Sequence, residues 1–291
     1  MGHKKYAVFS IDVETFADTE CIRSSGIQVD VDLMDGFEEY IKILDKHGIK
    51  STLFTLGDLA PKIVDMLKPC IANGHSLALH SYAHDAPMNV PLEQFREKTR
   101  LAKARMKELF GIDVSGFRAP CFSMDKARLD ILQELGFRYD SSRLDYLQAR
   151  HTVNIDLSDF NQLRKGIFRR DNFYEFSLAK EKVFGAPFPI SGGGYVRLSN
   201  WGFVKTLIRH YISKNDYYVF YLHPFELTKQ KVPFIKELKS YDRYYIKQGI
   251  STYNKRVEKI IIMLKKQGYE FVTFEQLVQI LGKEQPVCSA G

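Results

Sequence analysis

Short runs of apolar residues alternate along this chain with longer stretches in which apolar positions recur every three or four residues. The short runs predict buried β-strands, and the longer stretches predict amphipathic helices that cover them. Strands are expected at residues 6–11, 51–55, 76–79, 116–118, 137–139, 217–222 and 270–272. Helices are expected at residues 33–47, 60–73, 91–110, 125–135, 201–213, 250–267 and 275–281, several of them ending at a glycine. Such alternation is typical of parallel α/β sheets.

Two segments interrupt this pattern. Residues 143–190 are rich in polar and aromatic residues and predict only short strands and loops. Residues 225–250 predict an insertion that follows the strand at 217–222 and lies over its carboxyl end. Because the chain has no low-complexity linker, we expect a single domain over residues 1–282, followed by a flexible tail over residues 283–291.

The composition predicts a protein with a sizeable core, since 45% of the residues are hydrophobic and 13% are aromatic. The net charge of +7 would suit an anionic partner, but we favour a scattered basic surface because the chain lacks a nucleic-acid-binding signature. No segment approaches the roughly 18 apolar residues of a transmembrane helix, which leaves peripheral membrane contact open. The four cysteines show no disulfide-like spacing, so we expect a cytoplasmic protein, with a trimmed export signal as the alternative.

Residues suited to catalysis follow the predicted strands. Carboxyl ends of parallel strands meet at one rim of a barrel, and active sites are built there. The residues at these positions are Asp12 and Glu14 after the first strand, His80 after the third, Arg118 after the fourth, Asp140 after the fifth and His223 after the strand at 217–222.

The most informative spacing is that of His80 and His84. Two imidazoles four residues apart face one point either on successive turns of a helix or across a tight loop. With one carboxylate from elsewhere they form a two-histidine, one-carboxylate metal site with open positions for water and substrate. Such a site indicates metal-assisted hydrolysis, and the alternative is a hydrogen-bonded structural pair.

Five motifs, in this order, resemble those of the polysaccharide deacetylase family, which is also known as the NodB homology domain or carbohydrate esterase family 4. The resemblance spans about residues 6–280. It implies a distorted (β/α) barrel of seven strands. The motifs are Ser10-Ile11-Asp12-Val13-Glu14, His80-Ser81-Tyr82-Ala83-His84, Phe117-Arg118-Ala119-Pro120, Tyr139-Asp140-Ser141-Ser142 and Tyr221-Leu222-His223-Pro224.

The resemblance also implies a role for each residue. A divalent ion, Zn²⁺ rather than Co²⁺ or Ni²⁺, is expected on Glu14, His80 and His84, where it would lower the pKa of a bound water. Asp12 is expected to be the general base, aligned by a bidentate ion pair with Arg118. His223 is expected to protonate the leaving amine. The other two expectations are that Asp140 orients His223 and that the backbone amide of Cys121 or Phe122 stabilises the oxyanion.

Some assignments stay open. The family usually has adjacent aspartates in the first motif, whereas this chain has Asp12-Val13-Glu14, so the reverse assignment, with Asp12 as ligand and Glu14 as base, stays open. The sequence Asp140-Ser141-Ser142 is also that of an ordinary turn. The run from Gly192 to Gly194 predicts a hinge or a loop that substrate approaches closely.

The expected activity is removal of an N-acetyl group from a sugar or glycan precursor, lipid-linked or nucleotide-linked. One alternative is hydrolysis of a non-sugar C–N bond, as in allantoinase-like relatives of the family. Another is a catalytically silent carbohydrate-binding barrel.

Overall fold

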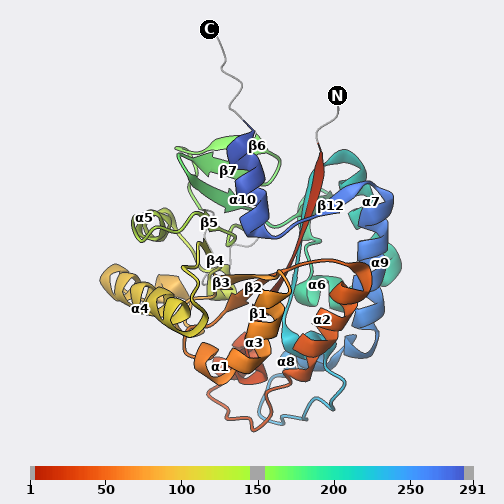
Figure 1. The fold of residues 1–291 in the computed structure, drawn as a ribbon. Coiled ribbons are helices and arrows are strands. Elements are labelled where there is room, and N and C mark those ends of the chain that lie inside the picture. Colours follow the sequence, from red (N-terminus) through yellow and green to blue (C-terminus); the bar gives the residue numbers. More distant parts are fainter. Residues whose placement is uncertain (1–3, 145–154, 285–291) are drawn as a thin grey trace.

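Strand β1 (Lys5–Val13) lies next to one edge of a ten-stranded sheet that curls into a barrel (Figure 1). The computed structural model describes residues 4–144 and 155–284. One side of β1 pairs with β11 (Tyr217–Leu222), and the other side pairs with β12 (Tyr269–Phe271) at its beginning and β2 (Thr52–Thr55) at its end. All these pairs are parallel, and β11 and β2 are buried along their whole length.

The parallel run continues from β2 through β3 (Ser76–Leu79), β4 (Gly116–Phe117), β5 (Tyr139–Asp140) and β8 (Phe173–Phe176). Seven successive strands, β11-β1-β2-β3-β4-β5-β8, are therefore parallel, which confirms the predicted distorted barrel. The sheet has further strands because β12 joins β1 and because β7 (Ile167–Arg170) and β6 (Asn161–Arg164) extend it beyond β8 in antiparallel pairing.

Helices surround the sheet, with α4 and α5 on one flank and α7 and α9 on the other (Figure 1). They form where the apolar periodicity predicts them, apart from boundary shifts of a few residues. They are α2 (Asp35–His47), α3 (Val64–Ala72), α4 (Leu92–Phe110), α5 (Lys126–Glu134), α7 (Trp201–Lys214), α9 (Ile250–Lys266) and α10 (Phe274–Lys283). Among the described residues, none of these helices combines the length and the apolar character needed to span a bilayer.

The short strands β6, β7, β8, β9 (Lys180–Val183) and β10 (Ala186–Pro189) lie in the region for which the sequence predicts short strands and loops. The short helices α1 (Glu20–Arg23), α6 (Gly193–Leu198) and α8 (Ser240–Lys247) lie where the sequence pattern predicts no helix. Of the predicted tail over residues 283–291, Lys283 is the last residue of α10, and residues 285–291, like residues 145–154, lie outside the described residues. The single-domain expectation stays a prediction, although strands from both halves of the chain pair in one sheet.

The residues of β1 alternate between two faces, as the pleat of a strand requires. Phe9 packs with the residues under the outer helices, whereas Tyr6 and Val8 belong to the apolar cluster that also includes the buried residues of α10. Ser10 and Asp12 continue the inward row of Tyr6 and Val8. The inside of the barrel is therefore apolar near the start of β1 and polar near its end.

Candidate active site

The carboxyl ends of the strands surround a cavity of about 410 Å³, whose lining includes Asp12, Glu14, His80, His84 and His223. Except for His223, these side chains are at most 5% exposed. In Figure 1 the segments that build this end, α1 and α8, lie opposite α10. The structure thus brings together five predicted site residues from the ends of three strands, β1, β3 and β11.

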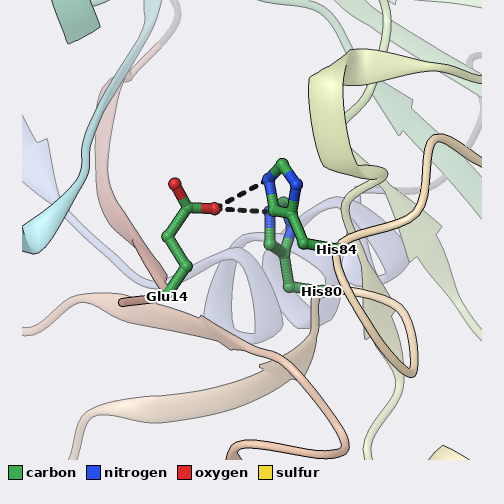
Figure 2. Close-up of side chains that lie close together, drawn as sticks. All are labelled: Glu14, His80 and His84. Carbon is green, nitrogen blue, oxygen red and sulfur yellow. Dashed lines mark ion pairs between the residues drawn. The ribbon is translucent and has the colours of Figure 1, made fainter. Parts of the chain in front are cut away.

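Glu14, His80 and His84 form a compact group (Figure 2). The Glu14 Oε2 atom lies 2.9 Å from His84 Nε2 and 3.6 Å from His80 Nε2. The two histidines lie in the loop after β3, which is the second of the two geometries that the spacing allows. Ser81 between them adopts a left-handed conformation with φ of 69°, and this turn lets both rings face Glu14.

This group has the chemistry of a metal site. His80 Nδ1 lies 2.9 Å from the carbonyl oxygen of Arg118, so Nδ1–H donates to that oxygen and Nε2 carries the free lone pair. Although Glu14 Oε2 is buried and close to two nitrogens, it has no hydrogen-bond partner within the described chain. Two imidazole nitrogens and one carboxylate oxygen are the ligands that Zn²⁺ and similar ions take in catalytic sites. The residues present therefore fit a divalent ion.

The charges in this group are strongly coupled. Burial by itself would raise the pKa of Glu14, but His84, His223 and His80 act against it, and the pKa of Glu14 lies well below its ordinary value. Burial would lower the pKa of His84, but Glu14 outweighs it and raises the pKa. Glu14 is therefore ionised near neutral pH, and a carboxylate must be ionised to bind a metal.

Asp12 makes an ion pair with the fully buried Arg118, whose Nη1 lies 2.7 Å from Asp12 Oδ1. The contact uses one nitrogen of Arg118 and one oxygen of Asp12, so the predicted bidentate ion pair is wrong. The same Nη1 also donates to Ser10 Oγ at 2.9 Å, while Nε and Nη2 donate to the carbonyl and hydroxyl oxygens of Ser141. The guanidinium group thus donates to three residues inside the barrel. Its Cζ atom also lies 4.1 Å from the centroid of the Phe54 ring. The second oxygen of Asp12 faces His223 Nε2 at 4.0 Å.

His223 has a different carboxylate partner from the predicted one. Its Nδ1 lies 3.2 Å from Glu226 Oε2, which also accepts a hydrogen bond of 3.1 Å from the His223 backbone amide. The other oxygen of Glu226 accepts a hydrogen bond of 2.8 Å from Nε of Arg197. Both Glu226 and Arg197 are buried. The prediction that Asp140 orients His223 is therefore wrong, and Glu226 is the carboxylate that contacts His223 Nδ1.

This arrangement also sets the charge of His223. Burial would lower the pKa of the imidazole, but Glu14, Glu226 and Asp12 together outweigh it and raise the pKa to about 9. The sequence pattern does not predict Glu226 as a site residue, although Glu226 lies three residues after His223. That spacing is the pattern of a capping box, in which the carboxylate turns back to the first residue of a short helix.

Asp140 stabilises the loop structure beneath the site. Its carboxylate accepts hydrogen bonds of 2.9 Å from both the amide and the hydroxyl of Ser142, which is the turn geometry that the sequence also allows. Ser142 Oγ in turn accepts a hydrogen bond from the Ala119 amide. Burial raises the pKa of Asp140 to about 6, and burial together with Asp140 raises the pKa of Glu175 well above its usual range. Each of these two carboxyl groups therefore binds a proton more readily in the folded chain than in the unfolded chain.

The run from Gly192 to Gly194 has a packing role. Gly192 has φ of 118°, and a Cβ there would lie 2.0 Å from the Tyr221 carbonyl oxygen. The Tyr221 amide donates to the Ser191 carbonyl at 2.8 Å, so this segment lies directly beside β11. Glycine is required because backbone approaches backbone here.

The segment at residues 225–250 lines the cavity. Its α8 contributes Tyr241, Asp242 and Tyr245 to the lining. Cys121 also lines the cavity, but burial and Glu20 raise the pKa of its thiol, which donates to Glu20 Oε2 at 3.2 Å. A protonated thiol is a poor nucleophile, so we assign Cys121 to the cavity wall.

Two family models match different parts of this chain. A family model described as polysaccharide deacetylase matches residues 22–139, and a model described as a domain of unknown function, DUF3473, matches residues 154–279. A peptidoglycan deacetylase of Helicobacter pylori is 24% identical over 107 residues, which are 37% of this chain and 36% of that protein. The chain matches about a third of the length of such curated relatives.

Solved structures share the fold. A putative polysaccharide deacetylase from Mycobacterium smegmatis has a TM-score of 0.61 at 15% identity, covering 98% of this chain and 93% of that one. A carbohydrate esterase family 4 pseudoenzyme from Bacillus anthracis has a TM-score of 0.55 at 13% identity, covering 96% of this chain and 66% of that one. The polysaccharide deacetylase model matches residues 22–139, and the described chain shares its fold with solved structures of that kind.

Proposed function

We propose that this protein is a metal-dependent hydrolase that removes the acetyl group from an N-acetylated sugar. The observation that carries the proposal is the position of Glu14 Oε2 between the Nε2 atoms of His80 and His84, without a hydrogen-bond partner in the described chain. The family supports the reaction class, since matched relatives are a peptidoglycan deacetylase and a chitin deacetylase.

Glu14, His80 and His84 would hold the ion, with Zn²⁺ expected first and Co²⁺ or Ni²⁺ as alternatives. When bound, such an ion supplies Lewis-acid activation of a water molecule and of the acetamide carbonyl. Glu14 is the ligand rather than Asp12 because Asp12 Oδ1 is already occupied by Arg118.

Asp12 would act as the general base. Arg118 fixes one oxygen of this carboxylate, so the other oxygen points into the cavity, where it can accept a proton from water. The pairing to a buried guanidinium also prevents Asp12 from turning toward other partners. Arg118 itself is a positioning residue, since it lies behind Asp12 and has no exposed surface.

His223 would protonate the leaving nitrogen. Because Glu226 accepts from the Nδ1 side, Nε2 faces the cavity, 3.9 Å from Glu14 Oε1 and 4.0 Å from Asp12 Oδ2. An amine leaves as a neutral molecule only if it gains a proton, so a donor at this position completes the reaction. The backbone amide of Phe122 already donates a hydrogen bond to the Ala119 carbonyl. The backbone amide of Cys121 is therefore the better candidate to donate to the oxyanion.

The test combines metal content with turnover. Purified protein is analysed by inductively coupled plasma mass spectrometry, and acetate release is then measured with N-acetylglucosamine and its oligomers. About one equivalent of a transition metal together with acetate release would support the proposal. Metal binding without acetate release from any of these sugars would indicate a different substrate or a silent barrel, and absence of metal after loading would overturn the hydrolytic mechanism.

A further inference from the structure

A groove between α7 and α9 gathers positive charge on one flank of the barrel (Figure 1). It has a volume of about 240 Å³. Four of its six lining residues are cationic and two are apolar, namely Lys205, Arg209, Lys259, Lys266, Ile262 and Met263. None of these residues lines the reaction cavity, so the groove is separate from the candidate active site.

Helix periodicity builds this groove. Lys205 and Arg209 are four residues apart on α7, so they lie on the same side of that helix. On α9, Lys259, Ile262 and Lys266 are three and four residues apart and form a stripe. Ile262, between the two lysines, is 43% exposed. The groove thus combines cationic side chains with an exposed apolar one.

The charge of this groove has no counterpart in the part of the chain that the structure describes, where none of the four cations makes an ion pair. Helix α7 contains no acidic residue. The one acid of α9, Glu258, lies 2.6 Å from Lys46 Nζ through its Oε1 atom. Because like charges gathered without acids repel one another, the groove lowers the stability of the folded chain until an anion occupies it. The four cations therefore indicate an anionic partner.

The hairpin of β9 and β10 lies along another side of α7. The ring of Phe188 in β10 packs edge-on against Phe203 of α7, with centroids 5.4 Å apart. In β9, Glu181 Oε1 lies 3.0 Å from His210 Nδ1 of α7. Phe203 and His210 are two helical turns apart and lie on a different side of α7 from the two groove cations. The hairpin, α7 and α9 are therefore neighbours on this flank, in that order.

The tip of the hairpin carries a phenylalanine that packs against nothing. Phe184 is fully exposed, and Phe184 and Gly185 form the turn between β9 and β10. Both residues have positive φ, 49° and 83°, as in a type I′ turn, in which asparagine and glycine are preferred. Neither core packing nor turn geometry therefore explains the phenylalanine. Exposed aromatic rings next to lysine and arginine are typical of surfaces that enter the interface of a bilayer.

We infer that the hairpin, α7 and α9 form a docking surface for the anionic face of a lipid bilayer. Lipid phosphates would lie at the four groove cations, and Phe184 would enter the apolar boundary beneath the headgroups. A nucleic acid could use the cations but has no apolar phase for an exposed phenylalanine. This inference goes beyond the proposed function and does not depend on it.

The test measures partition of the metal-loaded protein onto sucrose-loaded vesicles by sedimentation. One set of vesicles contains phosphatidylcholine alone, and the other contains about 30 mol% phosphatidylglycerol as the anionic lipid. Each set is used at about 0.1 M and about 0.5 M NaCl, because salt screens exposed charges. A double-stranded DNA fragment and inorganic phosphate are used as competing anions.

Two variants lose the same number of charges. The groove variant neutralises three exposed cations and carries Arg209→Gln, Lys259→Gln and Lys266→Gln. The matched control neutralises three exposed lysines near α3 and α4 and carries Lys62→Gln, Lys68→Gln and Lys107→Gln. A third variant, Phe184→Asn, removes the ring but suits the type I′ turn. Urea unfolding of each variant checks that the fold is kept.

The unmodified protein is expected to sediment with anionic vesicles at low salt and to be released at high salt. The groove variant should lower the partition coefficient about a hundredfold, since each cation near an anionic surface contributes about fivefold. The control should lower it less than about threefold, because its lysines lie outside the docking surface. Phe184→Asn should lower it about tenfold, the low end of what burial of one phenylalanine gives.

Four results would overturn the inference. They are equal binding to neutral and anionic vesicles, equal losses in the groove variant and the control, unchanged binding of Phe184→Asn, and displacement from vesicles by about 10 mM inorganic phosphate at constant ionic strength. Tighter binding to DNA than to vesicles at equal phosphate concentration, lost in the groove variant, would assign the groove to a nucleic acid instead.

Discussion

Replacing Glu226 by glutamine tests which carboxylate positions His223. The Glu226 carboxylate accepts hydrogen bonds from two groups of His223 on one oxygen and from Arg197 on the other. Glutamine has nearly the same shape but only one acceptor atom. In either orientation its NH₂ group must face a donor, so Glu226→Gln breaks the contact with His223 or the contact with Arg197.

The magnitude follows from the kind of contact that is lost. A hydrogen bond to a charged group is worth about 1.5–3 kcal/mol. If that energy holds the His223 imidazole in place for proton donation, kcat for an N-acetylated sugar should fall roughly 10- to 150-fold with little change in KM. Folding stability should also fall, since Arg197 is buried and would lose its charged partner.

A comparison of two substrates in the same sample separates these effects. Acetate release from an N-acetylated sugar requires protonation of the amine, whereas 4-nitrophenyl acetate loses a phenolate that leaves without a proton. Glu226→Gln should therefore reduce turnover of the amide far more than turnover of the ester. Asp140→Asn is the control, and it should leave the ratio of amide to ester turnover unchanged.

Two results would refute the reasoning about Glu226. Equal losses on both substrates would mean that Glu226 acts on folding alone. A fall in the amide-to-ester ratio for Asp140→Asn, with no fall for Glu226→Gln, would restore Asp140 as the partner of His223.

Three further predictions concern the metal, the buried ion pair and pH. Glu14→Gln should reduce bound metal from about one equivalent to a small fraction by mass spectrometry, whereas His210→Gln, at an exposed histidine outside the site, should not; equal metal in both would contradict the ligand assignment. Arg118→Met should lower the free energy of unfolding in urea by about 3–5 kcal/mol, because the buried Asp12 partner of this pair would be left uncompensated, and a loss below about 1 kcal/mol would contradict this. Since the pKa of Glu175 is raised well above its usual range and that of Asp140 to about 6, the folded chain keeps a proton that the unfolded chain loses above about pH 4. The free energy of unfolding should therefore fall as pH rises from 4 to 6, by about 1.4 kcal/mol per pH unit for one proton, and Glu175→Gln should flatten that slope. An unchanged slope in this variant would contradict the raised pKa of Glu175.

The sequence predicts the parts of the fold that depend on local pattern. The strand at 217–222 and the helix at 250–267 appear within a residue of their expected bounds, because continuous apolar runs and 3.6-residue periodicity are local signals. The short strands between residues 155 and 190 lack such a signal. β8 consists of four buried residues whose pairing with β5 is decided by the barrel rather than by their own sequence.

The site divides in the same way. The positions of Glu14, His80 and His84 follow from motifs placed at strand ends, and the structure brings these residues together. The partner of His223 could not be chosen by strand order alone. Glu226 reaches the imidazole because the four residues after His223 form a short helical turn, whereas Asp140 is captured by the amide and hydroxyl of Ser142.

Arg197 has a second contact that affects how this protein could be redesigned. Besides holding Glu226, it donates to the carbonyl oxygen of Gln248, directly after α8. A single buried cation therefore fixes both the residue that orients His223 and the end of the segment that carries the tyrosines. Exchange of residues 228–248 for the segment of a relative would therefore keep turnover only if the new segment returned a carbonyl oxygen to this point.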